Sequence, residues 1–173
     1  MRTTHVVVLP YNQRWKADFE AIRKEIAAAA GDWILGIEHV GSTSVEGLSA
    51  KPCIDIDVII KDDSVFGTVA GRLMKIGYFH EGNLGIEGRE AFRYEGKPHL
   101  QTHHLYVCPQ DSEELHRHLV FRNFLRTHPE AVQWYGAVKE KAAALFPEDI
   151  DRYMAYKAPC IEALYRECGL NDS

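Results

Sequence analysis

Two aspartates in the first half of the chain have the type and spacing to hold a metal ion. Asp55 and Asp57 alternate with apolar residues in a strand-like run at 53–60. Side chains on a strand alternate between its two faces, so both carboxylates project from one face. Such a pair can bind one divalent cation or two adjacent ones. The alternative is a half-exposed strand whose outer face carries aspartates without a function.

A turn of small residues precedes this run and has groups that suit phosphate. Gly41, Ser42 and Ser44 offer backbone N–H groups and hydroxyls, and Lys51 adds a positive charge. Phosphate oxygens are held by such donors. The same serines could instead cap a short helix, and Lys51 could be a solvated surface lysine. Taken together with the aspartates, the turn favours a metal–nucleotide site.

Basic residues of the C-terminal part could add to such a site. Arg122 and Arg126 are spaced to share one helix face, and Lys157 follows in the last predicted helix. Guanidinium groups match phosphate geometry, so the three side chains could hold a triphosphate or an anionic acceptor if they converge. Solvated helix charges, paired with nearby acidic residues, are the alternative.

The elements that position these residues follow from hydrophobic spacing. Trp15, Phe19, Ile22 and Ile26 recur at helical spacing, which predicts an amphipathic helix. An α/β half at 1–109 followed by a helical half at 110–173 predicts one α/β (α+β) domain with a helical extension. The expected elements are a short strand at 6–9, a helix at 12–30, strands at 34–40 and 53–60, a helix at 65–76, strands at 78–81, 90–94 and 101–107, and helices at 112–128, 130–146 and 148–168.

Composition narrows the class of protein. The chain has 173 residues and a formal net charge of −5, so no overall field favours nucleic acid or an anionic membrane. Its four cysteines form no C-x-x-C pair, which fits reduced thiols in the cytosol. No apolar stretch approaches the roughly 18 residues that span a bilayer. These features predict a cytoplasmic protein, and they say nothing of its oligomeric state.

Several separated blocks of the sequence resemble the GrpB family, a branch of the nucleotidyltransferase fold. They are the run at 38–45, Ala50-Lys51-Pro52, Ile54-Asp55-Ile56-Asp57, the blocks at 8–11, 103–107 and 121–126, and Tyr156-Lys157. The resemblance extends over nearly the whole chain. It implies a nucleotidyltransferase-like mixed sheet flanked by helices. It also implies that Gly41-Ser42 is the family's glycine–serine turn and that Asp55 and Asp57 are the metal-binding pair.

The sequence departs from an active transferase of this fold at one strand. A third carboxylate is expected on a later strand, and the natural candidate at 101–107 contains no acid. If this strand neighbours the aspartate strand, His104 and Tyr106 approach Asp55 and Asp57. Imidazole is a poor magnesium ligand and suits softer metals. Tyr106 stands where the family has a histidine, and His104 could also be an ordinary sheet histidine.

Two functions remain open at this point. One is a metal-dependent transferase, with Mg or Mn at Asp55 and Asp57 and a softer metal if His104 is a ligand. It would move a nucleotidyl group from a nucleoside triphosphate to a small-molecule acceptor. The other is a catalytically silent nucleotide- or metabolite-binding regulatory module, which the missing carboxylate favours.

Overall fold

The computed structural model describes residues 5–170, which group into two compact units. The sheet unit consists of Arg14–Val40 and Cys53–His118. The helical unit consists of Met1–Gln13, Gly41–Pro52 and Leu119–Ser173. The expected halves at 1–109 and 110–173 were divided at the point where the sequence changes from mixed strands and helices to helices alone. The two units are divided by which residues pack together.

The sheet unit contains a five-stranded mixed sheet in the order β1-β2-β5-β4-β3. Only the pairing of β2 with β5 is parallel among the described strands, and the other pairs are antiparallel. This confirms the mixed α/β fold expected from the sequence. The strands are β1 (Gly36–Val40), β2 (Ile54–Ile60), β3 (Tyr78–Gly82), β4 (Glu90–Tyr94) and β5 (His103–Pro109).

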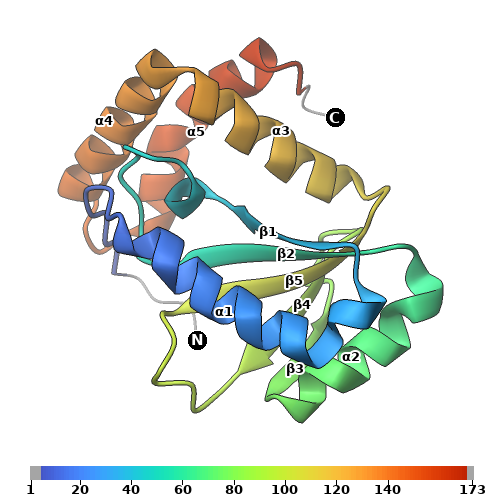
Figure 1. Cartoon of the computed structure of the whole chain (residues 1–173). Helices are drawn as coiled ribbons and strands as arrows, with labels where there is room; N and C mark the ends of the chain where they lie inside the picture. Colours follow the sequence, from blue (N-terminus) through green and yellow to red (C-terminus); the bar gives the residue numbers. More distant parts are fainter. Residues whose placement is uncertain (1–4, 171–173) are drawn as a thin grey trace. The chain divides into compact units, whose positions relative to one another are not determined.

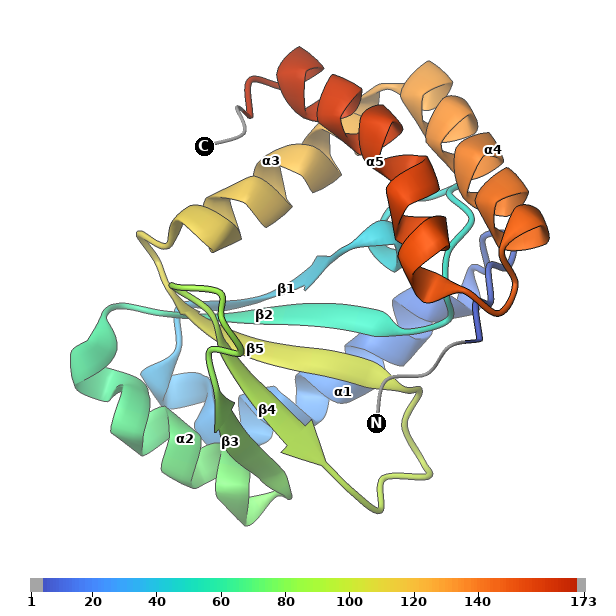
Figure 2. The ribbon, with the colours of Figure 1, turned by 180° about the vertical axis from the view of Figure 1, so that it is seen from behind.

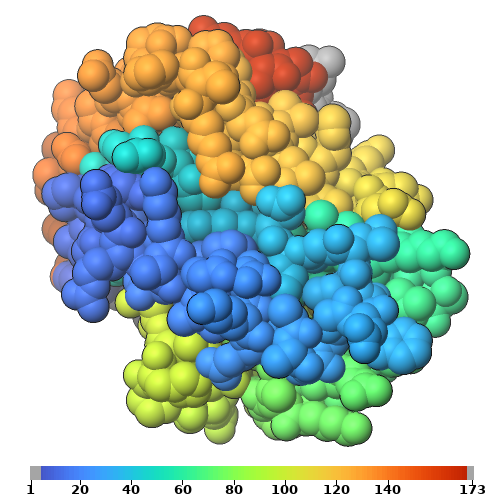
Figure 3. Space-filling model, viewed as in Figure 1, coloured from blue at the N-terminus to red at the C-terminus, as the bar shows by residue number. Residues whose placement is uncertain are grey.

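Two helices cover one face of this sheet. α1 (Arg14–Ala30) and α2 (Phe66–Lys75) lie on the same side of the strands in both ribbon views (Figures 1 and 2). In the space-filling view, the atoms of α1 stand in front of the strands (Figure 3). Ile22 and Ile26 of α1 are fully buried, as are Val69 and Leu73 of α2. Burial of this apolar stripe stabilises the layer.

Alternation along β2 separates the core from the polar face. Ile54, Ile56, Val58 and Ile60 are all fully buried, as a core-facing strand requires. The intervening carboxylates at 55 and 57 project from the opposite face. This arrangement was expected from the sequence.

The helical unit is built around a separate apolar cluster. Its helices are the later part of α3 (Glu113–Thr127), α4 (Pro129–Leu145) and α5 (Ile150–Glu167). Val45 and Leu48, from the segment between β1 and β2, pack in this cluster with residues of the helices. The helix residues concerned are Leu125, Ala131, Val132, Tyr135, Cys160 and Leu164.

The expected elements are present with small shifts at their ends, apart from the first strand. Residues 6–9 form no ladder, and only an isolated bridge joins Leu9 to Ala50. Pro10 follows at once and has no N–H to continue a ladder, which explains why pairing stops there. Within the described residues, no helix is both long and apolar enough to cross a membrane.

Candidate metal and phosphate sites

The polar face of the sheet brings two strands together at the candidate metal site. In the parallel ladder, Asp55 lies opposite His104 and Asp57 lies opposite Tyr106. The condition set by the sequence, that the strand at 101–107 neighbours the aspartate strand, is therefore met. Leu105 and Val107 point the other way and are buried in the core.

The two aspartates have very different surroundings. The Asp55 side chain is 33% exposed, and its Oδ1 lies 3.0 Å from Nδ1 of His104, whose side chain is 52% exposed. The Asp57 side chain is completely buried, and its Oδ2 lies 2.6 Å from Nδ1 of His118. Solvent and ligands therefore reach Asp55 more easily than Asp57.

His118 links the buried carboxylate to a second one. Its Nε2 lies 3.0 Å from Oε1 of Glu114, one helical turn earlier on α3. Burial alone lowers the pKa of His118, but hydrogen bonds to Asp57 and Glu114 and their charges raise it on balance. Burial raises the pKa of Asp57, and His118 opposes that rise. The two carboxylates against its ring nitrogens therefore favour the imidazolium form of His118.

Sequence reasoning missed His118 as a neighbour of the aspartates. The contact between His118 and Asp57 joins residues that are far apart in the chain, and no local sequence pattern predicts it.

Cys53 joins Asp55 and His104 in a cluster of metal-ligand types. One ligand atom from each residue lies within 4.8 Å of the others. Hydrogen bonds with Asp55 and then Cys53 raise the pKa of His104 to about 10. Cys53 could not be recognised as a ligand from the sequence, because a single cysteine beside a strand is more often a buried apolar residue.

Two buried polar atoms on this face lack a protein partner among the described residues. They are Oδ1 of Asp57 and Nε of Arg89. The Arg89 guanidinium lies 4.1 Å from the centre of the Tyr106 ring, which it covers. A buried carboxylate oxygen without a hydrogen bond is costly, and a bound cation would satisfy it. The residues present therefore fit a divalent metal at the carboxylate pair.

His103 has a structural role on the opposite face of the same strand. Its Nδ1 lies 2.7 Å from the Gln101 carbonyl oxygen and its Nε2 lies 2.8 Å from the Tyr78 hydroxyl. The ring also stacks on Tyr94. Burial lowers the pKa of His103, so the neutral ring is favoured. It donates from Nδ1 and accepts the Tyr78 hydrogen bond at Nε2.

The candidate phosphate turn lies in the helical unit. Gly41 has φ 73° and ψ −176°, a conformation that is essentially restricted to glycine. Ser44 Oγ donates to the Gly41 carbonyl at 2.5 Å, which closes the turn. Arg126 donates to the Ser44 carbonyl from Nε at 3.1 Å and from Nη2 at 2.9 Å. Arg126 therefore supports the backbone of the turn.

Lys139 of α4 brings a buried positive charge to this turn. Its Nζ donates to the hydroxyl of Ser42 and lies 3.4 Å from the Ser49 carbonyl oxygen. Nζ also lies 4.4 Å from the centre of the Tyr135 ring. Sequence reasoning missed Lys139, because a lysine in mid-helix reads as a solvated charge.

The other predicted phosphate ligands of the helical unit have separate surroundings. Lys51 is exposed. Arg122 donates from Nε to the Asn123 side chain. The Lys157 Nζ lies 4.8 Å from the Tyr153 ring centre, and burial lowers the pKa of this lysine. Their roles stay predictions.

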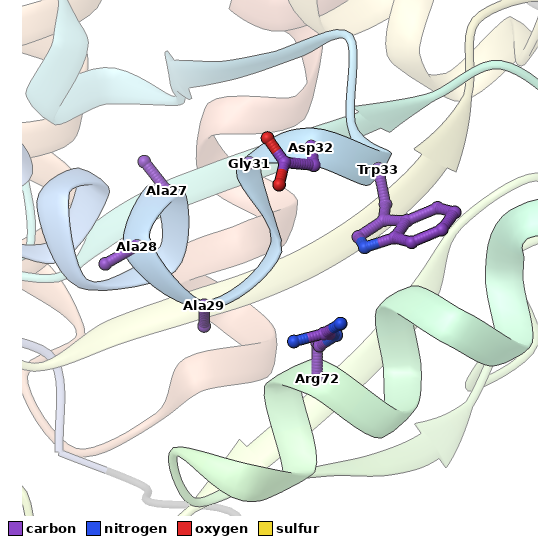
Figure 4. Close-up of a pocket in the computed structure, with 7 residues that line it drawn as sticks. All are labelled: Ala27, Ala28, Ala29, Gly31, Asp32, Trp33 and Arg72. Carbon is purple, nitrogen blue, oxygen red and sulfur yellow. The ribbon is translucent and has the colours of Figure 1, made fainter.

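A hollow elsewhere in the sheet unit does not share these ligands. Figure 4 shows Arg72 of α2 and Trp33 bordering it, with the small side chains at the end of α1. It holds one carboxylate, that of Asp32, and no histidine or cysteine. Its lining residues are Ala27, Ala28, Ala29, Gly31, Asp32, Trp33 and Arg72.

Comparison with solved structures identifies the fold. A structure of Cid1 in complex with its short product ApU matches with a TM-score of 0.55 at 10% identity, covering 79% of this chain and 43% of that one. A structure of the Cid1 poly(U) polymerase with MgGTP bound matches with a TM-score of 0.52. At this identity the likeness concerns the fold alone, which is nucleotidyltransferase-like.

The family is narrower than the fold. The model of the GrpB protein family matches residues 5–167, so the chain belongs to the GrpB family. The crystal structure of the conserved protein GrpB from Enterococcus faecalis matches with a TM-score of 0.77 at 33% identity, covering 93% of this chain and 98% of that one. The UPF0157 protein YqkA of Bacillus subtilis is 32% identical over 152 residues, which are 88% of this chain and 44% of that protein.

Proposed function

We propose that this chain is a divalent-metal-dependent nucleotidyltransferase. It would transfer a nucleotidyl group from a nucleoside triphosphate to a hydroxyl or amine of a small acceptor. The observation that carries the proposal is the Asp55–Asp57 pair on one strand face, with a buried Asp57 oxygen that lacks a protein partner. The nucleotidyltransferase-like fold supports the same reading.

The proposed reaction is a displacement at the α-phosphorus of the triphosphate. The acceptor oxygen or nitrogen forms a bond to the α-phosphorus. The bond between the α-phosphorus and the oxygen that bridges to the β-phosphorus breaks, and pyrophosphate leaves. A metal at the carboxylate pair would neutralise phosphate charge and favour the attacking group. Asp55 and Asp57 would bind it, and His104 would orient Asp55 through their hydrogen bond.

Glu114 offers the third carboxylate that the strand at 101–107 lacks. It reaches Asp57 through His118, whose two ring nitrogens contact the two carboxylates. His118, between these two carboxylates, would hold Asp57 in place for a metal. The acceptor proton would be taken up at Asp55, the carboxylate of the pair that solvent reaches.

The turn at Gly41–Ser44 would bind the phosphates of the substrate. Ser42 offers a hydroxyl that already accepts from Lys139, and the ammonium group of Lys139 can equally well donate to a phosphate oxygen. Lys51, Arg122 and Lys157 are proposed as further cations. Base preference and acceptor identity depend on pocket shape, which these residues do not define.

A catalytically silent binding module is the second candidate. One observation favours it: each aspartate already has a histidine partner, His104 or His118. A module of this kind would bind nucleotide and release no pyrophosphate.

Turnover separates the two candidates. The full chain is incubated with each nucleoside triphosphate, Mg²⁺ or Mn²⁺ and a set of small acceptors, and pyrophosphate is measured. If the chain is a transferase, pyrophosphate is released, and Asp57→Asn abolishes the release. Asp63→Asn, at an exposed position of the same unit, leaves the release unchanged. Binding without release under every condition would establish the silent module instead.

Triphosphate binding tests the turn separately. Ser42→Ala removes one hydroxyl, and a hydrogen bond to a charged group is worth about 1.5 kcal/mol or more. Affinity should fall about tenfold. Ser64→Ala, an exposed serine of the sheet unit, is the matched control. Triphosphate binding measured without divalent metal should be weaker, because a metal would neutralise phosphate charge.

A further inference from the structure

We propose that Cys53, Asp55 and His104 form a site for a thiol-binding transition metal such as zinc or cobalt. The inference deepens the proposed function, on which it rests for the location of the metal on β2, and it names the class of ion. It adds a ligand, Cys53, that lies outside the carboxylate pair.

The geometry comes from the alternation of β2 and its pairing with β5. Cys53 directly precedes β2, two residues before Asp55. His104 lies directly opposite Asp55 in the parallel ladder. One ligand atom from each of the three residues lies within 4.8 Å of the others, and the group is alone of its kind within residues 5–170.

These separations are close to those of a bound ion. Metal–ligand bonds of about 2.0–2.3 Å in a tetrahedral site place ligand atoms about 3.3–3.8 Å apart. The Asp55 and His104 atoms are already 3.0 Å apart. The remaining adjustment is about 1 Å or less, which side-chain rotation can supply without movement of the strands.

The set of donor atoms selects the ion. A thiolate and an imidazole are soft or borderline ligands, which suit zinc and cobalt and are poor for magnesium. A magnesium site would use carboxylate and water oxygens instead. Asp57 is outside the three-residue group, and one of its oxygens already accepts from His118.

Burial indicates how the site is used. Cys53 is buried, with 6% of its surface exposed, whereas the side chains of Asp55 and His104 are partly open to solvent. Three protein ligands leave a fourth tetrahedral position for water or substrate, whereas structural zinc sites are closed by four.

Metal titration of the reduced full chain tests the site. Zinc affinity is measured by calorimetry, and Co²⁺ is added to follow the thiolate-to-cobalt charge-transfer absorption in the near ultraviolet. Cys53→Ser should remove this absorption. Loss of outer-shell partners alone costs about 10- to 100-fold in metal affinity, so loss of a direct ligand should weaken zinc by about tenfold or more.

Matched variants identify the ligand. Cys168→Ser changes a thiol outside the group and should leave both signals as in the wild type. His104→Ala should weaken zinc as Cys53→Ser does. Circular dichroism and the melting temperature of each metal-free variant report folding, and only variants that melt as one transition are compared.

The outcomes separate this inference from the proposed function. Cys53→Ser with wild-type zinc affinity and an unchanged cobalt spectrum would overturn the inference and leave the carboxylate pair untouched. Unchanged Mg²⁺ or Mn²⁺ binding in Asp57→Asn would count against the carboxylate pair, while the Cys53 site would stand. Loss of zinc in Cys53→Ser with Mg²⁺ binding retained supports the inference.

Discussion

Three histidines of the sheet unit differ in burial and in their hydrogen-bond partners, and their roles differ accordingly. His103 is neutral and buried between Tyr78 and Tyr94, His104 is half-exposed beside Asp55, and His118 bridges two carboxylates. The three roles could not be told apart from the positions of the histidines in the sequence, because they depend on burial and on the partner of each ring.

The first prediction concerns the buried pair of Asp57 and His118. His118→Ala leaves a fully buried carboxylate without its imidazolium, which typically costs about 3–5 kcal/mol of stability. His104→Ala breaks an exposed pair with Asp55, which should cost about 0–1 kcal/mol. Urea denaturation of both metal-free variants at neutral pH measures the difference.

A double variant shows whether the unpaired charge is the cause. Asp57→Asn combined with His118→Ala removes the carboxylate as well, so part of the lost stability should return. Equal losses in His118→Ala and His104→Ala would contradict the assignment of Asp57 as the buried partner.

The second prediction concerns the pH dependence that His103 imposes. Burial lowers the pKa of His103 from its usual 6.5. Above this value the ring is neutral in both folded and unfolded chains. Below it the unfolded chain takes up the proton first, so this contribution to stability is lost as pH falls from 6.5 toward the lower folded pKa.

The slope of the free energy of unfolding against pH, compared between wild type and His103→Gln, separates the contribution of His103 from that of the other titrating groups. Wild type and His103→Gln are unfolded in urea at several values between about pH 7.5 and pH 5.5. The wild type should lose more stability toward acid than the variant does. The variant is less stable throughout because the Tyr78 hydrogen bond is altered. Parallel curves would show that His103 titrates alike in both states.

Much of the polar face of β2 could be predicted from the residues alone. Strict alternation at 53–60 places Asp55 and Asp57 together, and the same rule places His104 beside them once the strands are neighbours. His118 and Lys139 could not be found in this way. Their contacts depend on how a helix packs, and a histidine or lysine in a helix carries no local sign of its partner.

At the scale of elements, the turn between β1 and β2 depends on the backbone conformation of one glycine. The positive φ of Gly41 begins the 3₁₀ turn at Ser42–Ser44, and Arg126 holds its last carbonyl. Glycine between a strand and a serine-rich segment predicted the turn. It did not predict that a helix arginine would support it.

The third prediction concerns that glycine. Gly41→Ala places a Cβ where the backbone has φ 73°, which should cost roughly 1–3 kcal/mol. Gly71→Ala is the matched control, because it lies within α2 and an added Cβ meets no atom within 4 Å. It should stabilise the chain by about 0.5–1 kcal/mol.

In thermal denaturation, the melting temperature should fall for Gly41→Ala and rise for Gly71→Ala. Triphosphate binding is measured beside it, because a distorted turn should also displace the Ser42 hydroxyl. A stable Gly41→Ala variant with unaltered melting would contradict the backbone conformation described for this turn.

At the scale of the whole molecule, the two units are not consecutive stretches of chain. The helical unit draws on three segments, and the segment between β1 and β2 contributes Val45 and Leu48 to its core. Helical content in the sequence marked only where α3 begins. It could not show that a short loop in the first half packs with the last helices.

The fourth prediction follows from this interleaving. A fragment of residues 1–109 keeps Val45 and Leu48 but lacks the α4 and α5 residues that bury them. It should bind a hydrophobic dye and unfold with lower cooperativity than the full chain. Near-ultraviolet circular dichroism and dye fluorescence measure both. A fragment with one sharp transition and no dye binding would show that the segment finds other partners.

The two faces of β2 also bear on how such a protein can change over time. Its buried isoleucines form part of the core, while Asp55 and Asp57 project from the other face, opposite His104 and Tyr106 of β5. In the proposed metal site, an exchange of side chain at position 53 or 106 would alter the preference for an ion and leave the isoleucine packing as it is. Mutation can therefore explore new chemistry on this strand pair while the architecture is conserved.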